Sequence, residues 1–167
     1  MGERVDALAT EYEQALAELL AVVEGCSDEQ WRAACAEEGW PVGVTAHHVA
    51  DWWPVVLPVV RALAAGEAFQ VPSLDDVHEK NARHAREQAA CTKEETLALL
   101  RRGRVEAAAT IRGLSDAQLE RAAPIWGGRE LSLERLIRFN LIGHARTHAA
   151  GIRAALAQTG PATPTQP

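Results

Sequence analysis

Three histidines in this sequence have the spacing and the surroundings to bind a single metal ion. His144 and His148 are four residues apart, so a helix would stack their imidazoles on one face. Both belong to an apolar series with steps of three and four residues, formed by Leu133, Ile137, Leu141, His144, His148 and Ile152. His48 begins a similar series in an earlier segment, with Trp52, Val55, Val59 and Leu63. Burying three imidazoles without partners would cost on the order of 1–3 kcal/mol each, so a shared cation is the simpler explanation.

Three histidine ligands would leave coordination positions open, which is typical of a catalytic or ligand-binding metal rather than a closed structural site. Imidazole suits zinc, nickel, copper and iron alike, so the residues alone do not select the metal. Ala145 stands where the HExxH motif of zinc proteases has its glutamate, and no other residue stands out as a general base, which argues against a hydrolase. The alternative is that the three histidines are ordinary packed core residues, or that a shifted register exposes the HxxxH pair.

Further polar and aromatic residues could shape a pocket beside these histidines, namely Trp52, Asn81, His84, Arg104 and Trp126. Asn81 and His84 share a predicted helical face, although a surface position is the simpler assignment for His84. Arg104 lies on the apolar stripe of its predicted helix, where it could hold a substrate carboxylate. Trp126 is in a loop marked by proline and glycine.

The other histidines and tryptophans have simpler predicted roles. His47 would lie about 100° from His48 around a helix and should flank the site. His78 is followed by two charged residues and should be exposed, whereas Trp31 and Trp40 are assigned to the core. Trp52 and Trp53 are adjacent, so we expect that they do not both face inward and that one reaches a pocket rim or an interface.

Helical signals dominate the chain and predict an all-α fold, a four-helix bundle with short extra helices in the connections. Apolar periodicity predicts helices over 3–24, 42–65, 74–89, 93–112 and 133–158. Capping boxes begin at Ser27, Ser73, Thr92 and Ser115. Pro54 and Pro58 should kink the second long helix or break it after Trp53. No alternating pattern predicts a useful strand. We expect one domain over residues 1–158 and a disordered tail over 159–167, which is rich in proline and threonine.

Composition limits the class of protein. The chain is 47% hydrophobic and 24% charged, with a net charge of −6 and no run of lysine and arginine, which favours a soluble globular protein and argues against a nucleic-acid partner. The apolar stretch over 55–65 is too short to span a membrane and contains Pro58 and Arg61. Three cysteines, Cys26, Cys35 and Cys91, are odd in number and far apart, which indicates reduced thiols and a cytoplasmic protein.

Two segments resemble the DinB-like (YfiT-type) superfamily. Residues 39–49, GWPVGVTAHHV, resemble a segment in which a tryptophan precedes the metal-binding histidine by eight residues, and Trp40 then selects His48 over His47. Residues 141–148, LIGHARTH, are similar to the HxxxH of the final helix. The resemblance covers roughly residues 5–156. Departures are Pro41, where a capping serine or threonine is common, the two helix prolines, and Thr147, where relatives often have an acidic residue.

The resemblance implies a four-helix bundle with a three-histidine site for zinc or nickel, frequently dimeric. Some relatives are thiol S-transferases or isomerases that use mycothiol, bacillithiol or glutathione. We therefore expect a metal-dependent thiol transferase that acts on a small molecule and forms a homodimer. The alternative is a stress-response protein that binds a metal or small ligand without turnover.

Overall fold

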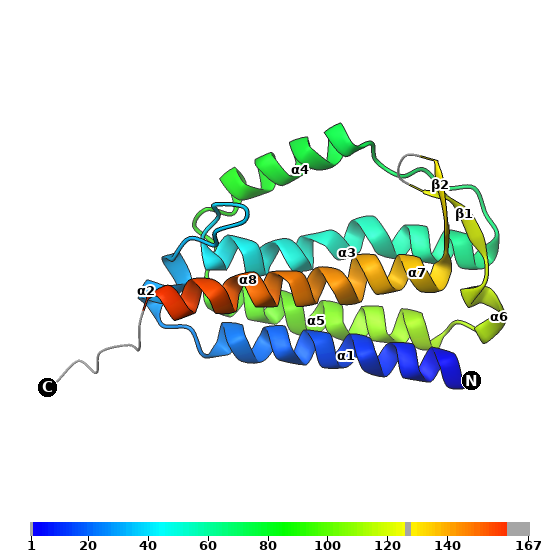
Figure 1. Cartoon of the computed structure of the whole chain (residues 1–167), viewed down its shortest axis with the longest axis horizontal. Coiled ribbons are helices and arrows are strands. Elements are labelled where there is room, and N and C mark those ends of the chain that lie inside the picture. The colour runs from blue at the N-terminus through cyan, green and yellow to red at the C-terminus, as the bar shows by residue number, and fades with distance from the viewer. Residues whose placement is uncertain (1, 126–127, 160–167) are drawn as a thin grey trace, which may run out of the picture.

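Four long helices lie side by side in the computed structural model of the chain, which describes residues 2–125 and 128–159 (Figure 1). They are α1 (Glu3–Glu24), α3 (Val42–Ala65), α5 (Lys93–Arg112) and a last helix made of α7 (Leu133–Ile137), the π-helical segment η1 (Arg138–Gly143) and α8 (His144–Gln158). The helical bundle predicted from apolar periodicity is confirmed. Residues 160–167 of the predicted tail lie outside the described residues.

Shorter elements connect the long helices. They are α2 (Asp28–Arg32), α4 (Leu74–Glu87), α6 (Asp116–Leu119), β1 (Ala122–Ile125) and β2 (Arg129–Ser132). Figure 1 shows α4 as a separate layer above α3 and α8. The strands form an antiparallel hairpin in which Ala122 faces Ser132, and this hairpin was not expected. Strands of four residues are too short to carry a recognisable period of two.

Side-chain caps fix where the helices begin. At Ser27, Ser73 and Ser115 the serine side chain accepts a bond from the backbone three residues on, and that residue's side chain accepts from the cap in return, so these capping boxes are confirmed. At Thr92 only the first bond forms: the backbone N–H of Glu95 donates to the Thr92 hydroxyl, and that hydroxyl donates to the Glu95 carboxylate at 2.7 Å.

Helix α3 is continuous through Pro54 and Pro58, so of the two predicted effects of the prolines, a kink or a break after Trp53, the break is wrong. Each proline removes a single backbone hydrogen bond, and burial of most of the helix between its neighbours holds it together. Gly66, with φ of 74°, ends it in the left-handed conformation that glycine adopts without strain.

Both Trp52 and Trp53 are buried, with 7% and 6% of their surfaces exposed, which corrects the expectation that only one could face inward. They point to different neighbours, since Trp52 stacks near His144 of α8 while Trp53 packs on Gly103 of α5. A Cβ at Gly103 would lie 1.9 Å from the Trp53 ring, so glycine permits the close approach of α3 and α5. Helix α3 is therefore the central helix, covered on several sides.

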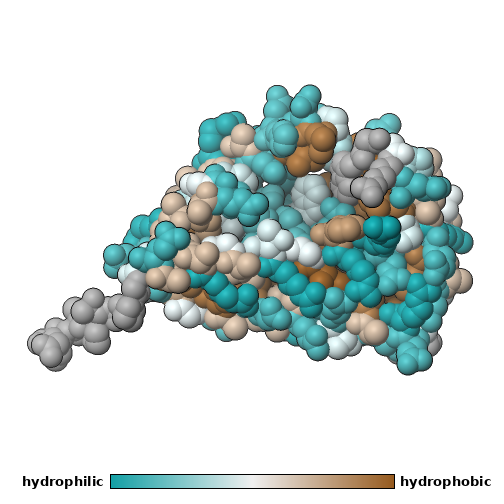
Figure 2. Space-filling view, viewed as in Figure 1, coloured by the Kyte–Doolittle hydropathy of each residue, from teal (hydrophilic) through white to brown (hydrophobic). Residues whose placement is uncertain are grey.

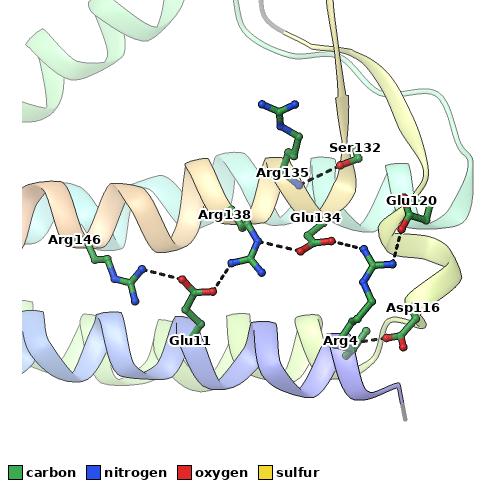
Figure 3. Close-up of polar contacts among 10 residues, drawn as sticks. Arg4, Glu11, Asp116, Glu120, Ser132, Glu134, Arg135, Arg138 and Arg146 are labelled. Carbon is green, nitrogen blue, oxygen red and sulfur yellow. Dashed lines mark hydrogen bonds and ion pairs between the residues drawn. The ribbon is translucent and has the colours of Figure 1, made fainter.

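A chain of ion pairs links α1 to the last helix (Figure 3). Arg4 donates to Glu134, and Glu134 accepts from Arg138 at 3.0 Å. Arg138 also donates to Glu11, whose other oxygen accepts from Arg146 at 2.9 Å. These side chains are half-exposed, so each pair contributes little by itself. As a connected series they favour one axial position of the last helix against α1.

No helix in the described part of the chain combines the length and the apolar composition needed to cross a membrane.

Candidate metal centre

The three predicted ligands converge on one point between α3 and α8. The Nε2 atom of His144 lies 3.2 Å from Nε2 of His48 and 3.1 Å from Nε2 of His148. One ligating atom from each ring falls within 4.8 Å of the others, and this is the group of metal-binding side chains found among the described residues. Nitrogen ligands at 2.0–2.1 Å from a tetrahedral zinc ion are about 3.3 Å apart. The observed separations therefore fit a shared cation.

Hydrogen bonds alone cannot account for the close approach of these ring nitrogens. A nitrogen of neutral imidazole either donates one proton or accepts through one lone pair. Nε2 of His144 faces two ring nitrogens at hydrogen-bonding distance, so only one of the two contacts can be a hydrogen bond. A cation that accepts all three lone pairs removes the conflict, and the donor set suits zinc, nickel and related divalent ions.

The protein keeps these rings in the neutral form that binds metals. Burial lowers the pKa of His48 to about 3, and its neighbours His148 and His84 add to the effect. The pKa of His144 is lowered well below its usual value, again mainly by burial. Burial also lowers the pKa of His148, although the carboxylates of Glu38 and Glu37 oppose this. At neutral pH no proton has to be displaced before a metal binds.

Glu38 faces the outer nitrogen of one ligand. Its Oε1 atom lies 3.2 Å from Nδ1 of His148. A carboxylate in this position favours the tautomer with its proton on Nδ1, which leaves the Nε2 lone pair directed at the cation. Sequence reasoning missed Glu38 because it lies in the loop before α3, where side chains follow no helical period.

A tight turn brings Glu38 and Trp40 to the site. The backbone N–H of Gly39 donates to the carbonyl of Cys35 at 2.9 Å, and the N–H of Cys35 donates to the carbonyl of Trp40 at 2.8 Å. Gly39 has φ of 69°, which only glycine adopts readily. Trp40 then stands edge-on to His48, with ring centroids 5.3 Å apart. Trp40 is thus half-buried beside a ligand instead of in the core, and its spacing from His48 has a structural reason.

A cavity of about 290 Å³ opens beside the three histidines. It is lined by Glu38, Trp40, His48, Trp52, Val77, Asn81, Asn140, His144 and His148. Figure 2 shows the surface hollowed between the layer that holds α4 and the bundle below it. Helix α4 contributes Val77 and Asn81 to the wall, and Asn81 Oδ1 is buried with no hydrogen-bond partner among the described residues. The predicted pocket residues Trp52 and Asn81 are therefore both in this lining.

His84 is buried, with 5% of its surface exposed, so its assignment to the surface is wrong. It lies behind His48, with ring centroids 5.5 Å apart, and beside His47 at 5.1 Å. Its Nδ1 atom is 3.5 Å from Asp51, which also pairs with Lys80. Helix α4 folds back over the first half of α3 and covers these side chains, so His84 supports the centre from behind and does not line the cavity. Sequence periodicity within α4 cannot reveal which helix covers it.

The remaining predicted residues are elsewhere or not described. Arg104 is half-buried on α5, acts electrostatically on Tyr12 and Glu13 of α1, and is not in the lining of this cavity. Helix α5 packs against α1 and α3. Trp126 lies outside the described residues. His78 is exposed, as predicted.

The helix that carries His144 and His148 is widened immediately before them. Segment η1, Arg138–Gly143, is π-helical and runs directly into α8. A π-helical turn accommodates extra residues and changes the direction in which later side chains point, and such turns are frequent at functional sites. It allows His144 and His148 to face α3 while Leu133 and Ile137 remain in the core.

A family model described as the DinB superfamily matches residues 11–152. The chain belongs to the DinB superfamily. Among solved structures, this DinB-superfamily chain is similar to YfiT from Bacillus subtilis, described as a probable metal-dependent hydrolase with an unusual four-helix bundle topology. That similarity has a TM-score of 0.78 at 22% identity and covers 96% of this chain and 90% of YfiT.

Two further structures share the fold. One is the colibactin self-resistance protein ClbS in complex with a double-stranded DNA, with a TM-score of 0.72, 16% identity, and coverage of 91% of this chain and 94% of ClbS. The other is DfsB, a sibling lethal factor precursor, with a TM-score of 0.71, 18% identity, and coverage of 97% and 100%. At these identities the similarity establishes the fold alone. No curated protein sequence matches the chain.

Proposed function

We propose that this DinB-superfamily protein is a metal-dependent enzyme that binds one divalent cation, zinc or nickel, through His48, His144 and His148. The observation that carries the proposal is the convergence of three neutral Nε2 atoms beside an open cavity. YfiT, with the same fold, is described as a probable metal-dependent hydrolase, which supports a divalent metal here.

We further propose that the reaction transfers a low-molecular-weight thiol to a small electrophile, as the resemblance to thiol transferases suggests. When bound, the cation would supply Lewis-acid chemistry, lowering the pKa of a thiol or polarising the electrophile. The protein's own residues orient the reactants: Glu38 holds His148, while Trp40, Trp52 and Val77 form an apolar wall that excludes water from one side of the cavity.

Hydrolysis is the second candidate, and one observation favours it. Sequence reasoning argued against a hydrolase because no general base stood out, yet Glu38 places a carboxylate in the cavity lining. A protein that binds the metal and a small ligand without turnover remains the alternative from the sequence.

We propose a small molecule as the binding partner. We also propose that the protein is a homodimer and that it is cytoplasmic. ClbS is seen with double-stranded DNA, but here the net charge of −6 opposes binding to a phosphate backbone. Cytoplasmic location rests on the three free cysteines Cys26, Cys35 and Cys91. The homodimer rests on the resemblance.

Elemental analysis of native protein with a His144→Ala variant tests the proposal. We expect about one zinc or nickel ion per chain in the native protein, because three histidines make one open site. His144→Ala should lose it, whereas His78→Ala, which changes an exposed histidine, should keep it. Full metal content in His144→Ala would remove the basis of the proposal. A screen of small thiols with electrophiles, with and without EDTA, then separates transfer from hydrolysis and from binding without turnover.

A further inference from the structure

The charge of the cavity wall restricts what the cavity can bind. Among the described residues that line it, Glu38 is the one carboxylate, and none is a lysine or arginine. The three histidines line the cavity as the proposed ligands, and imidazole binds a metal in its neutral form, so they add no charge to the wall. Asn81 and Asn140 contribute uncharged amides, and the remaining wall is apolar. A bound divalent cation is balanced by Glu38 together with one metal-bound thiolate, so a further negative charge on the ligand would have no counter-ion in the cavity wall.

Glu38 lines the cavity and also contacts one of the proposed metal ligands. Its Oε1 atom is 3.2 Å from His148, and its side chain is 20% exposed, so it is partly shielded from solvent. Coulomb interactions are several times stronger at such sites than in bulk water. Lys80 on α4, which acts electrostatically on His48, is not in the cavity lining and is paired with Asp51. Arg104, the residue predicted to hold a substrate carboxylate, is on α5 and is not in the cavity lining.

We infer that the cavity selects small molecules whose groups next to the reacting atom are uncharged or positively charged, with Glu38 as the residue that rejects anions. The preferred cosubstrate is a thiol that carries hydroxyl, amide or ammonium groups near the sulfur and no carboxylate there. Hydroxyl and ammonium groups can donate to Glu38 and to an amide oxygen of Asn81, while the carbon skeleton packs against Trp40 and Trp52. The inference rests on the proposed function, since it takes the metal centre as the place where the ligand binds.

Three thiols of equal length but different charge test this inference: 2-aminoethanethiol, 2-mercaptoethanol and mercaptoacetate. Their dissociation constants are measured by isothermal titration calorimetry on zinc-loaded protein, so the readout is binding and not activity. Wild type is compared with Glu38→Gln, because glutamine still accepts from His148 Nδ1 but carries no charge. Differences in thiol acidity and chelation cancel in this comparison, since both proteins meet the same three thiols. Glu29→Gln, which removes an exposed carboxylate of α2 outside the cavity lining, is the matched control.

The quantity compared is the dissociation constant of mercaptoacetate divided by that of 2-aminoethanethiol. Glu38→Gln should reduce this ratio by about tenfold relative to wild type, which corresponds to about 1.4 kcal/mol. Glu29→Gln should leave the ratio unchanged. A ratio that Glu38→Gln does not alter would overturn the inference while leaving the metal centre intact. Loss of the proposed function would look different, because the protein would then retain no zinc or bind none of the three thiols.

Discussion

At the scale of single residues, the contact between Glu38 and His148 decides how well the centre is preorganised. Without the carboxylate, the Nδ1 atom of His148 has no partner to fix its proton there, and the ring can rotate or change tautomer. Partners of this kind are worth about 10–100-fold in metal affinity in other proteins. We expect Glu38→Ala to weaken zinc binding by about that factor, measured by competition with a chromophoric chelator.

The conservative variant distinguishes orientation from charge. Glu38→Gln should retain most of the zinc affinity, because its amide oxygen can accept from the same Nδ1. Equal affinity in wild type and Glu38→Ala would show that His148 needs no partner to bind the metal.

At this scale the buried faces of helices were predictable, whereas side chains in loops were not. The structure brings His48, His144 and His148 together, because an apolar series fixes which face of a helix is buried. Glu38 escaped notice because its position depends on the Gly39 turn. Arg104 was misplaced because a helical stripe shows that a residue faces a neighbour without showing which neighbour.

At the scale of elements, the apolar residues of the last helix are spaced slightly more widely than the turns of an α-helix. Its apolar series runs from Leu133 to Ile152, which is nineteen positions in five steps. Five α-helical turns take about 18 residues. The extra residue is accommodated in η1, Arg138–Gly143. A period slightly longer than that of an α-helix could therefore have indicated the π-helical segment, whereas the hairpin of β1 and β2 had no comparable signal.

Two glycines inside helices should respond oppositely to alanine. Gly103→Ala places a Cβ 1.9 Å from the Trp53 ring and forces α3 and α5 apart, which should cost about 1–3 kcal/mol of unfolding free energy. Gly151→Ala, in α8, meets nothing within 4 Å and should stabilise the protein by about 0.5–1 kcal/mol, because glycine is a poor helix former. Urea denaturation measures both changes.

The pair is its own control, since each variant adds one methyl group to a long helix. If Gly103→Ala were as stable as wild type, the close packing of α3 on α5 would be wrong. If Gly151→Ala were strongly destabilised, the surroundings of α8 would be wrong.

At the scale of the whole molecule, the bundle was predictable because each long helix carries its own apolar period and its own cap. The covering of α3 by α4 was not predictable, because it depends on contacts between residues far apart in the sequence. Asp51 and Lys80, for example, are 29 residues apart. The same covering buries His84 and much of the centre, so the fold as a whole determines how the histidines titrate.

The metal-free protein should lose stability as the pH falls below 6.5, and more steeply below pH 4.5. The pKa values of His48, His144 and His148 are lowered from 6.5 in the folded state, mainly by burial. Below that pH the unfolded chain gains protons that the folded protein does not, so the free energy of unfolding falls as the pH decreases from 6.5. A second loss should begin near pH 4.5. Burial alone would raise the pKa of Glu11, but hydrogen bonds from arginines lower it below 4.5.

Thermal unfolding followed by circular dichroism in EDTA, from pH 8 to pH 3, measures both parts of the decrease. His144→Asn should flatten the decrease between pH 6.5 and 5, because it removes a buried imidazole, whereas Glu11→Gln should leave that decrease unchanged and reduce only the loss below pH 4.5. Saturating zinc should raise the melting temperature at pH 7, and the gain should disappear on acidification as protons compete for the ring nitrogens. A metal-free protein with the same melting temperature at pH 7 and pH 5 would mean that the three rings are exposed enough to protonate while folded, which contradicts a buried centre.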